Sequence, residues 1–229
     1  MSRDSQYIDQ TFRRAVYLER LKQSMVNDFG LTLKQIDKLI GQLDIESLTA
    51  KQLDKYLDTL DKQLTKTLGV WSDNYREQLS EIFADCYEFE KQSLVKAYEV
   101  PATAIATPSN LAALSYVAMA KPLPLTGNTG IPLDDLIKDL NNNEVKRIKQ
   151  AVRMGHFEGK TNQQLVQQIR GTRANKFKDG ILQTTTRHAE AIVRTGVQQV
   201  ANDARLEIAK QNSDIVIGEQ IVATLDKLT

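Results

Sequence analysis

Cysteine is almost absent from this sequence, which has one cysteine and two histidines among 229 residues. The single Cys86 excludes an intramolecular disulfide framework and any cysteine-cluster metal site within these residues. His156 and His188 lie too far apart in the chain to predict a zinc site, so we expect neither a metal nor a cofactor. Aromatic residues make up only 6% of the chain, and the core must therefore be built from Leu, Ile, Val and Ala.

Long apolar runs and an excess of one charge are also missing. No apolar run approaches the length of a membrane span, and residues 1–6 show no signal-peptide core, so we expect no membrane partner and synthesis in a reducing cytoplasm. The 30 Lys and Arg residues nearly cancel the 29 Asp and Glu residues. The balance is uneven, however, because residues 1–99 carry 14 basic and 17 acidic side chains, whereas residues 141–212 carry 13 and 6. This asymmetry favours a nucleic acid or an acidic partner for the C-terminal half.

Proline is confined to one stretch. All five prolines lie between positions 101 and 132, and proline both lacks a backbone N–H and clashes with the preceding helical turn. We therefore predict a Pro/Ala-rich linker at 100–132, with a short helix at 111–120, that lets two helical parts take different relative positions. These parts are an N-terminal long-helix domain at 1–99 and a second helical domain at 133–229, which we expect to be incomplete. The predicted fold class is mainly α, with a small β element at the C-terminus.

Apolar residues recur every three or four positions through the N-terminal part, as on one face of a helix. The first such face includes Ile8, Phe12 and Met25, and Gly30 is expected to end its helix. A capping box at Thr32 predicts the start of a second helix, and another at Thr49 the start of a much longer one. The stripe of this longer helix has a mean spacing of about 3.6 residues, which is typical of a straight helix. Its members are Leu53, Leu57, Leu60, Leu64, Leu68, Trp71, Tyr75, Leu79, Ile82, Cys86, Phe89 and Ser93.

The C-terminal part shows the same periodicity up to residue 211. The predicted elements are helices at 133–140 and 144–157, a turn at Gly159, a capped helix between Thr161 and Gly171, a basic loop at 172–180 and a long helix at 186–211. Gly196 lies beside the apolar face of the last helix, where it allows close approach of another backbone. Beyond it, the β-branched segments 215–217 and 221–225 predict two strands.

The sequence shows no nucleophile–base pair, phosphate-binding glycine loop or cluster of metal ligands, so we predict that the protein is not an enzyme. Gly159, Lys160 and Thr161 match the end of a P-loop, but Met154 stands at the position of its first glycine and no strand precedes it. A helix cap and turn is the favoured interpretation. We interpret His188 as a structural residue, because a lone histidine rarely acts without an orienting partner.

Seven basic residues of the C-terminal half are candidates for nucleic-acid binding. Two interpretations stay open: a patch that binds DNA phosphates without base preference, or solvated charges that keep the protein in solution. A phosphate-binding patch requires these side chains to lie on one surface. The candidates are Lys146, Arg147, Lys149, Arg153, Arg173, Lys176 and Lys178.

Short segments near the C-terminus carry a resemblance to a known family. The pattern Ala-x-x-Ile-x-Arg-Thr stands at 189–195, Asn-x-x-Arg at 202–205 and Val-Ala-Thr-Leu-Asp at 222–226. In this order and spacing they resemble the minor head proteins, or head-morphogenesis proteins, of tailed bacteriophages (the Mu-type F-protein family). The resemblance extends over about 133–229. It departs from the family at Gly196, where many members have Glu, and the chain ends before the family's Cys-containing turn.

The resemblance implies a minor capsid protein inside the virion near the portal vertex, with several copies around the portal. It implies the portal protein and other head proteins as partners, packaged double-stranded DNA as a further one, and roles in head assembly and DNA packaging or delivery. Two alternatives stay open: a portal-ring or head–tail adaptor protein, and a non-specific DNA-binding helical module. The motif residues expected to make structural ion pairs or partner contacts are Arg187, Arg194, Thr195, Asn202, Arg205 and Asp226.

Overall fold

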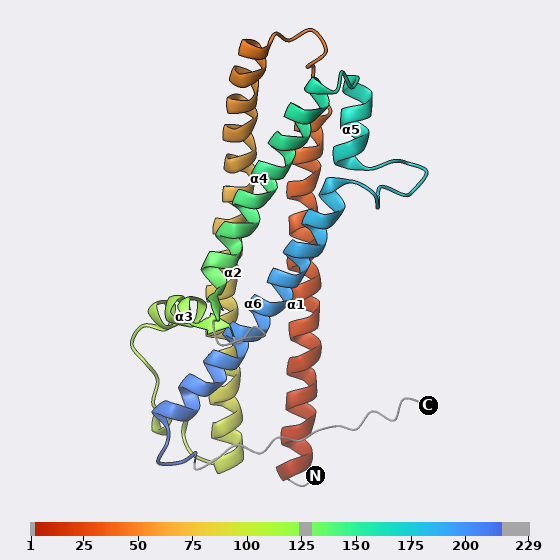
Figure 1. Ribbon diagram of the computed structural model, residues 1–229. Coiled ribbons are helices and arrows are strands. Elements are labelled where there is room, and N and C mark those ends of the chain that lie inside the picture. Colours follow the sequence, from red (N-terminus) through yellow and green to blue (C-terminus); the bar gives the residue numbers. More distant parts are fainter. Residues whose placement is uncertain (1–2, 124–129, 217–229) are drawn as a thin grey trace.

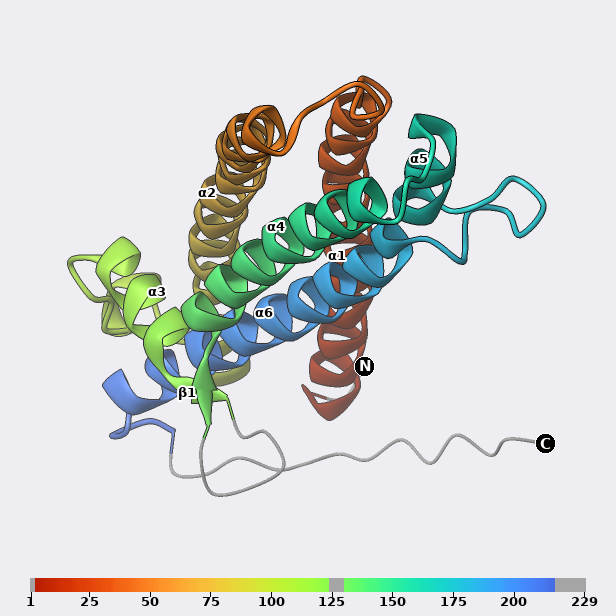
Figure 2. The same cartoon turned by 45° about the horizontal axis from the view of Figure 1, so that its top comes forward.

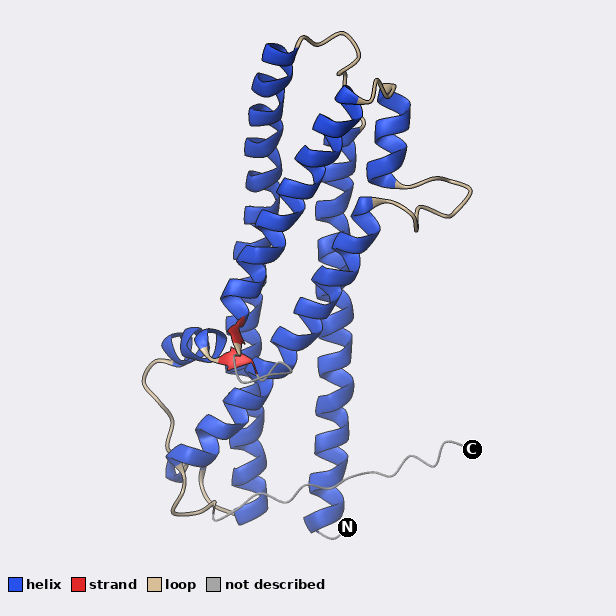
Figure 3. Ribbon diagram, in the orientation of Figure 1, coloured by secondary structure: helices blue, strands red, loops and turns tan. Residues whose placement is uncertain are grey.

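The protein consists almost entirely of helices (Figure 3), which confirms the mainly α class. The computed structural model describes residues 3–123 and 130–216. The elements within them are α1 (Arg3–Ile40), α2 (Ala50–Tyr98), the short 3-10 helix η1 (Ala102–Ala104), α3 (Leu111–Ala120), β1 (Pro122–Leu123), β2 (Ile131–Pro132), α4 (Leu133–Phe157), α5 (Asn162–Arg170) and α6 (Ile181–Gln211).

Two long antiparallel helices, α1 and α2, lie side by side, and α4 and α6 cross them as a second layer (Figures 1 and 2). Helix α6 packs against α1, α2 and α4. The shorter helices cover opposite flanks: α3 packs on α2 and α6, and α5 packs on α4 and α6. None of the described helices is both long enough and apolar enough to cross a membrane.

Helix α1 is longer than the sequence predicted. Gly30 lies inside it, and no new helix starts at Thr32, so both predictions are wrong. The reason is tertiary burial: Phe29 and Ile36, on either side of the glycine, are almost fully buried. Burying a large apolar side chain stabilises the fold by about 1.5–3 kcal/mol, which outweighs the roughly 1 kcal/mol cost of a glycine within a helix. The predicted apolar face fails near its start, where Phe12 is 69% exposed.

Helix α2 confirms the long helix predicted from the stripe. Eleven of the twelve stripe residues are buried, and Phe89 is partly buried. The N-terminus is capped as expected, because the Thr49 backbone N–H donates to the Gln52 side-chain oxygen at 2.9 Å. Near the middle, the Trp71 ring stacks on Tyr75 with centroids 5.4 Å apart. Cys86 is buried as predicted, and burial raises the pKa of its thiol.

Helix α4 is one helix, not the two predicted at 133–140 and 144–157. Three successive asparagines at 141–143 suggested a break, since asparagine favours turns over helix interiors. The buried positions Leu140 and Val145 lie on either side of them and hold the segment against the core. The Asn141 side-chain amide also donates to the Ser72 hydroxyl of α2 at 2.6 Å, so packing and this bond outweigh the local preference.

The capped helix after the turn at Gly159 forms as predicted. The Thr161 and Gln164 side chains each accept a hydrogen bond from the other's backbone N–H, and Gly171 ends α5 with a φ of 97°. Helix α6 begins at Ile181, five residues before its predicted start. Gly196 provides the expected close approach, because a Cβ added there would lie 2.2 Å from the Tyr75 hydroxyl oxygen.

The β element lies in the middle of the chain and not at the C-terminus. Strands β1 and β2 form a small antiparallel hairpin in which Leu123 pairs with Ile131. The predicted strand at 215–217 does not begin at Ile215 or Val216, because both donate their backbone N–H to the Asn212 carbonyl in the turn after α6. The predicted strand at 221–225 lies outside the described residues. The predicted helix at 111–120 is confirmed as α3.

The segments on either side of 100–132 share one hydrophobic core. One polar cluster also joins them: the Arg14 guanidinium of α1 forms an ion pair with Glu90 of α2 and donates to the Ala201 carbonyl of α6 at 2.7 Å. Tyr75 adds a second link between α2 and α6, because its hydroxyl donates to the Ile192 carbonyl at 2.9 Å. Residues 3–98 and 133–216 are therefore packed together as one structural unit.

Candidate functional site: the outer face of α6

Two basic residues of α4 point toward α2. Lys149 forms an ion pair with Asp61, and an Arg153 guanidinium nitrogen lies 3.1 Å from an Asp54 carboxylate oxygen. Side-chain hydrogen bonding from Lys149 lowers the pKa of the Asp61 carboxyl. These two cations of the predicted DNA-binding set therefore contribute to the contact between α2 and α4. Lys146 is exposed beside them.

Arg147, also on α4, pairs with Glu144 of the same helix, and the three remaining basic candidates lie in the loop at 172–180. Arg173, Lys176 and Lys178 are exposed there. Figures 1 and 2 show this loop projecting beyond α5, away from the side of α4 that faces α2. The seven candidates thus occupy two separate regions, and the structure does not bring them together on one surface.

The family-motif residues lie on the side of α6 that faces away from the core. Arg187, Arg194 and Asn202 are exposed, and Thr195 and Arg205 are partly buried. The residues that alternate with them along the helix form its buried apolar face, which consists of Ala189, Val193, Val197, Val200, Ala204 and Ile208. The motif therefore combines residues that pack the core with polar residues that face outward. Asp226 lies outside the described residues.

Arg194, expected to make either structural ion pairs or partner contacts, has two carboxylates beside it within the chain. Its guanidinium lies 3.2 Å from Glu190 of α6 and 3.2 Å from Glu19 of α1. Both carboxylates are about half exposed, so these pairs contribute at most about 1 kcal/mol to stability. The hydrogen bond from Lys22 is the main reason that the pKa of Glu19 is lowered, with Arg194 adding to it. The outer face of α6 thus continues onto α1 through charged side chains.

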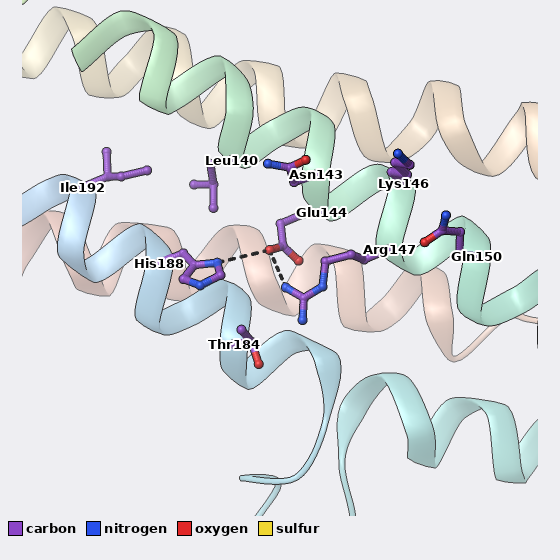
Figure 4. Close-up of a pocket in the computed structure, with 9 residues that line it drawn as sticks. All are labelled: Leu140, Asn143, Glu144, Lys146, Arg147, Gln150, Thr184, His188 and Ile192. Atoms are coloured by element: carbon purple, nitrogen blue, oxygen red, sulfur yellow. Dashed lines mark hydrogen bonds and ion pairs between the residues drawn. The ribbon is translucent and has the colours of Figure 1, made fainter. Parts of the chain in front are cut away.

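A buried carboxylate lies where α6 meets α4 (Figure 4). Glu144 of α4 is 1% exposed and accepts a hydrogen bond from the Thr185 hydroxyl of α6. The Arg147 guanidinium lies 2.9 Å from the same carboxylate, and the His188 Nδ1 atom lies 3.6 Å from it. A buried charge is tolerated only when it is paired and hydrogen-bonded, and Thr185 and Arg147 meet that requirement here.

A groove of about 560 Å³ opens above this carboxylate, between α4 and α6. Arg147 and His188 stand on opposite sides of Glu144, one from each helix (Figure 4). Both are partly exposed, and the Arg147 guanidinium keeps donors that Glu144 does not use. The groove therefore suits a polar or acidic segment of a partner that accepts hydrogen bonds. Its other lining residues are Leu140, Asn143, Lys146, Gln150, Thr184 and Ile192.

This cluster was not predicted from the sequence, although the position of Glu144 in the sequence is one sign of it. Glu144 falls at a helical spacing between Leu140 and Ile148, so it is a charged residue within an apolar stripe. Such a position predicts a buried charge with a partner. The partners Thr185 and His188 are more than 40 positions away, and no local pattern connects them to Glu144.

No protein-family model, curated protein or solved structure matches this chain. The phage resemblance thus rests on the short segments after residue 186. Among the described residues, no group of His, Cys, Asp and Glu side chains is arranged to hold a metal ion.

Proposed function

We propose that the chain is a minor head protein of a tailed bacteriophage, which binds the portal vertex and assists head assembly and DNA packaging or delivery. One observation supports this proposal above the others: the polar residues of the family-like motif face outward on α6. Arg187 and Asn202 are exposed, and packing of the core does not require their identity. Outward residues in a recognisable pattern are better explained by a binding partner than by folding.

The chemistry of this face fits a protein partner. Arginine is enriched at protein interfaces because its planar guanidinium forms several directed hydrogen bonds and packs on apolar surface. Arg187, Arg194 and Arg205 place three guanidinium groups along one helix, and the groove beside Glu144 adds unused donors on its other side. An acidic surface of the portal would complement them.

The location of the chain in particles tests the proposal directly. Virions of the phage that encodes it would be labelled with a gold-conjugated antibody fragment against the chain after the capsids are opened. We expect label at a single vertex, the one that carries the tail. Label at all vertices, or in the tail alone, would contradict a portal-bound head protein.

A variant tests the proposed surface. Arg187→Glu combined with Asn202→Glu should abolish retention of the purified chain on immobilised portal protein while leaving its helix content unchanged. The matched control is Lys62→Glu combined with Lys66→Glu, since both lysines are exposed on α2. Equal retention of both variants would show that the portal is bound elsewhere.

The two alternatives make different predictions. A portal-ring or adaptor protein forms a closed ring without a partner, and its copy number stays fixed as protein concentration and salt change, which the mass of the purified protein would reveal. A DNA-binding module would bind unrelated duplexes, with an affinity that falls steeply as salt rises. Because Lys149 and Arg153 are paired with carboxylates of α2, the exposed loop cations are the main candidates for that activity.

A further inference from the structure

The loop between α5 and α6 exposes an aromatic ring among cations. Phe177 is 46% exposed between Lys176 and Lys178, beside a hollow that it lines with residues of α1, α5 and α6, and Arg173 is exposed in the same loop. Lys176 and Phe177 have φ values of 53° and 60°, a left-handed backbone conformation that residues other than glycine rarely adopt. Backbone strain of this kind concentrates at functional positions.

The Asp179 carboxylate holds the loop in this shape. Asp179 accepts 2.7 Å hydrogen bonds from the Thr172 backbone N–H, the Thr172 hydroxyl and the Asn175 side-chain amide. These bonds, with that from Asn175 the largest cause, keep the pKa of Asp179 far below its ordinary value. The loop is therefore ordered before any partner binds, and a partner does not have to supply the free energy of ordering it.

The opposite flank of the molecule exposes an apolar helix face. Helix α3 contains no charged residue. Tyr116 is 60% exposed and Val117 is 55% exposed, and the alanines at 112, 113 and 120 face outward with them. Adjacent exposed apolar side chains on one helix indicate a surface that a partner covers.

Carboxylates of α2 line the edge of this face. Tyr116 borders a hollow of about 460 Å³ whose other lining residues are Asp73, Arg76, Glu77, Ser80 and Glu81. Asp73, Glu77 and Glu81 follow one another at intervals of four residues, an arrangement of like charges that weakens an isolated helix. Arg76 is already paired with Asp134 at 2.6 Å and with Asp73 at 3.1 Å. Glu77 and Glu81 have no basic partner within the described ranges 3–123 and 130–216, so cations of a partner would relieve this repulsion.

We infer that the loop at 172–180 of one copy docks on the α2–α3 face of a second copy. Phe177 supplies an apolar ring for Tyr116 and Val117, and the loop cations face the carboxylates of Glu77 and Glu81. The loop and α3 lie on opposite sides of the molecule in both views (Figures 1 and 2), so one chain does not bind its own loop. The contact is head to tail, and repetition of such a contact gives a ring or a filament.

Self-association of the full chain tests this inference. Sedimentation velocity over a range of protein concentrations should show oligomers that dissociate as salt rises, because exposed charge pairs are screened. Phe177→Ala, or Lys176→Glu with Lys178→Glu, should weaken association about tenfold or more, as should Glu77→Lys with Glu81→Lys. The control Lys62→Glu with Lys66→Glu, on an exposed face of α2, should leave association unchanged. Circular dichroism spectra would verify that all variants are folded.

Mixing the variants identifies the geometry. The Phe177→Ala variant keeps an intact α2–α3 face, and the variant with Glu77→Lys and Glu81→Lys keeps an intact loop, so their mixture should form dimers and nothing larger. Combining all four charge reversals in one chain should restore the oligomers. A wild-type chain that stays monomeric at low salt, or oligomers that the loop and face variants do not affect, would overturn the inference. Loss of duplex DNA binding by the loop variant with unchanged self-association would also overturn it and assign the loop to nucleic acid. None of these outcomes depends on whether the chain binds a portal.

Discussion

Gly196 is the residue at which α6 comes closest to α2. An added Cβ would lie 2.2 Å from the Tyr75 hydroxyl oxygen and 2.9 Å from a Leu133 methyl group. Gly196→Ala should therefore lower the free energy of unfolding by roughly 1–3 kcal/mol, because Tyr75 is nearly fully buried and must shift. Urea denaturation measures the change. The matched control is Gly69→Ala in α2, where an added Cβ meets nothing within 4 Å and should raise stability by up to about 1 kcal/mol. Equal effects at both sites would contradict the close approach.

Asp179 gives the loop at 172–180 a defined response to pH. Its folded pKa lies far below its unfolded value of about 4, so its contribution is complete above pH 4. That contribution is lost progressively as the pH falls below 4 toward the folded pKa. We expect the Thr172 amide proton signal in NMR spectra to be unchanged between pH 7 and pH 4 and to shift only below that. Asp179→Asn should remove this acid transition, and a midpoint near pH 4 in the unaltered protein would contradict the hydrogen-bond network.

Glu144 should matter for stability more than an exposed carboxylate does. Glu144→Ala removes one acceptor of the buried Thr185 hydroxyl, which keeps the Ile181 carbonyl at 3.2 Å. It also removes the partner of the partly exposed Arg147, so we expect a cost of roughly 1–3 kcal/mol. Glu144→Gln retains an acceptor and should cost less. Thermal denaturation would measure both. Glu190→Ala, which removes an exposed partner of Arg194, serves as the control and should cost at most about 1 kcal/mol.

At the scale of elements, a substitution at Gly30 distinguishes a continuous helix α1 from a helix that ends at this glycine. In a continuous helix the position is open, with nothing within 4 Å of an added Cβ. Gly30→Ala should then raise the free energy of unfolding by roughly 0.5–1 kcal/mol, since alanine is the better helix former. At a helix end with positive φ, the same change would lower it. Urea denaturation therefore distinguishes the two structures by the sign of the change.

The capping boxes show how far local sequence determines these elements. Those at Thr49 and Thr161 open helices as predicted, whereas the same pattern at Thr32 lies inside α1. The difference is tertiary, because Phe29 and Ile36 are buried on both sides of Gly30 and no local pattern records what covers them. Helix α2 was predictable without tertiary information, because its apolar stripe keeps the period of a helix over 40 residues.

The candidate site was less predictable than the fold. Periodicity placed Val193 and Val197 in the core, and so indicated that Arg194 faces away from it. Glu19 beside Arg194 and Thr185 beside Glu144 come from other helices, and a single sequence does not specify which helices meet. The same limit applied to the basic candidates: Lys149 and Arg153 are close to Lys146 in sequence, yet α2 supplies the carboxylates that pair with them.

At the scale of the whole molecule, the shared core predicts cooperative unfolding. Trp71 is the only tryptophan and lies in that core against Phe29 of α1, with ring centroids 4.8 Å apart. We expect Trp71 fluorescence and helix content by circular dichroism to follow one urea transition with the same midpoint. Two transitions, with the fluorescence changing in only one, would instead support independent units on either side of 100–132. An Arg14→Ala variant, which removes the cluster joining α1, α2 and α6, should lower both midpoints together.

The single buried thiol of Cys86 allows opening of the core to be measured by the rate of its chemical labelling. Cys86 is 2% exposed, and burial raises the pKa of its thiol, so a maleimide reagent reacts with it only in molecules whose core has opened. With no second cysteine in the chain, one rate constant describes the whole labelling reaction. When closing is faster than labelling, that rate divided by the rate for an exposed thiol gives the equilibrium constant for opening. The free energy of opening is thus measurable in native buffer, without any engineered probe.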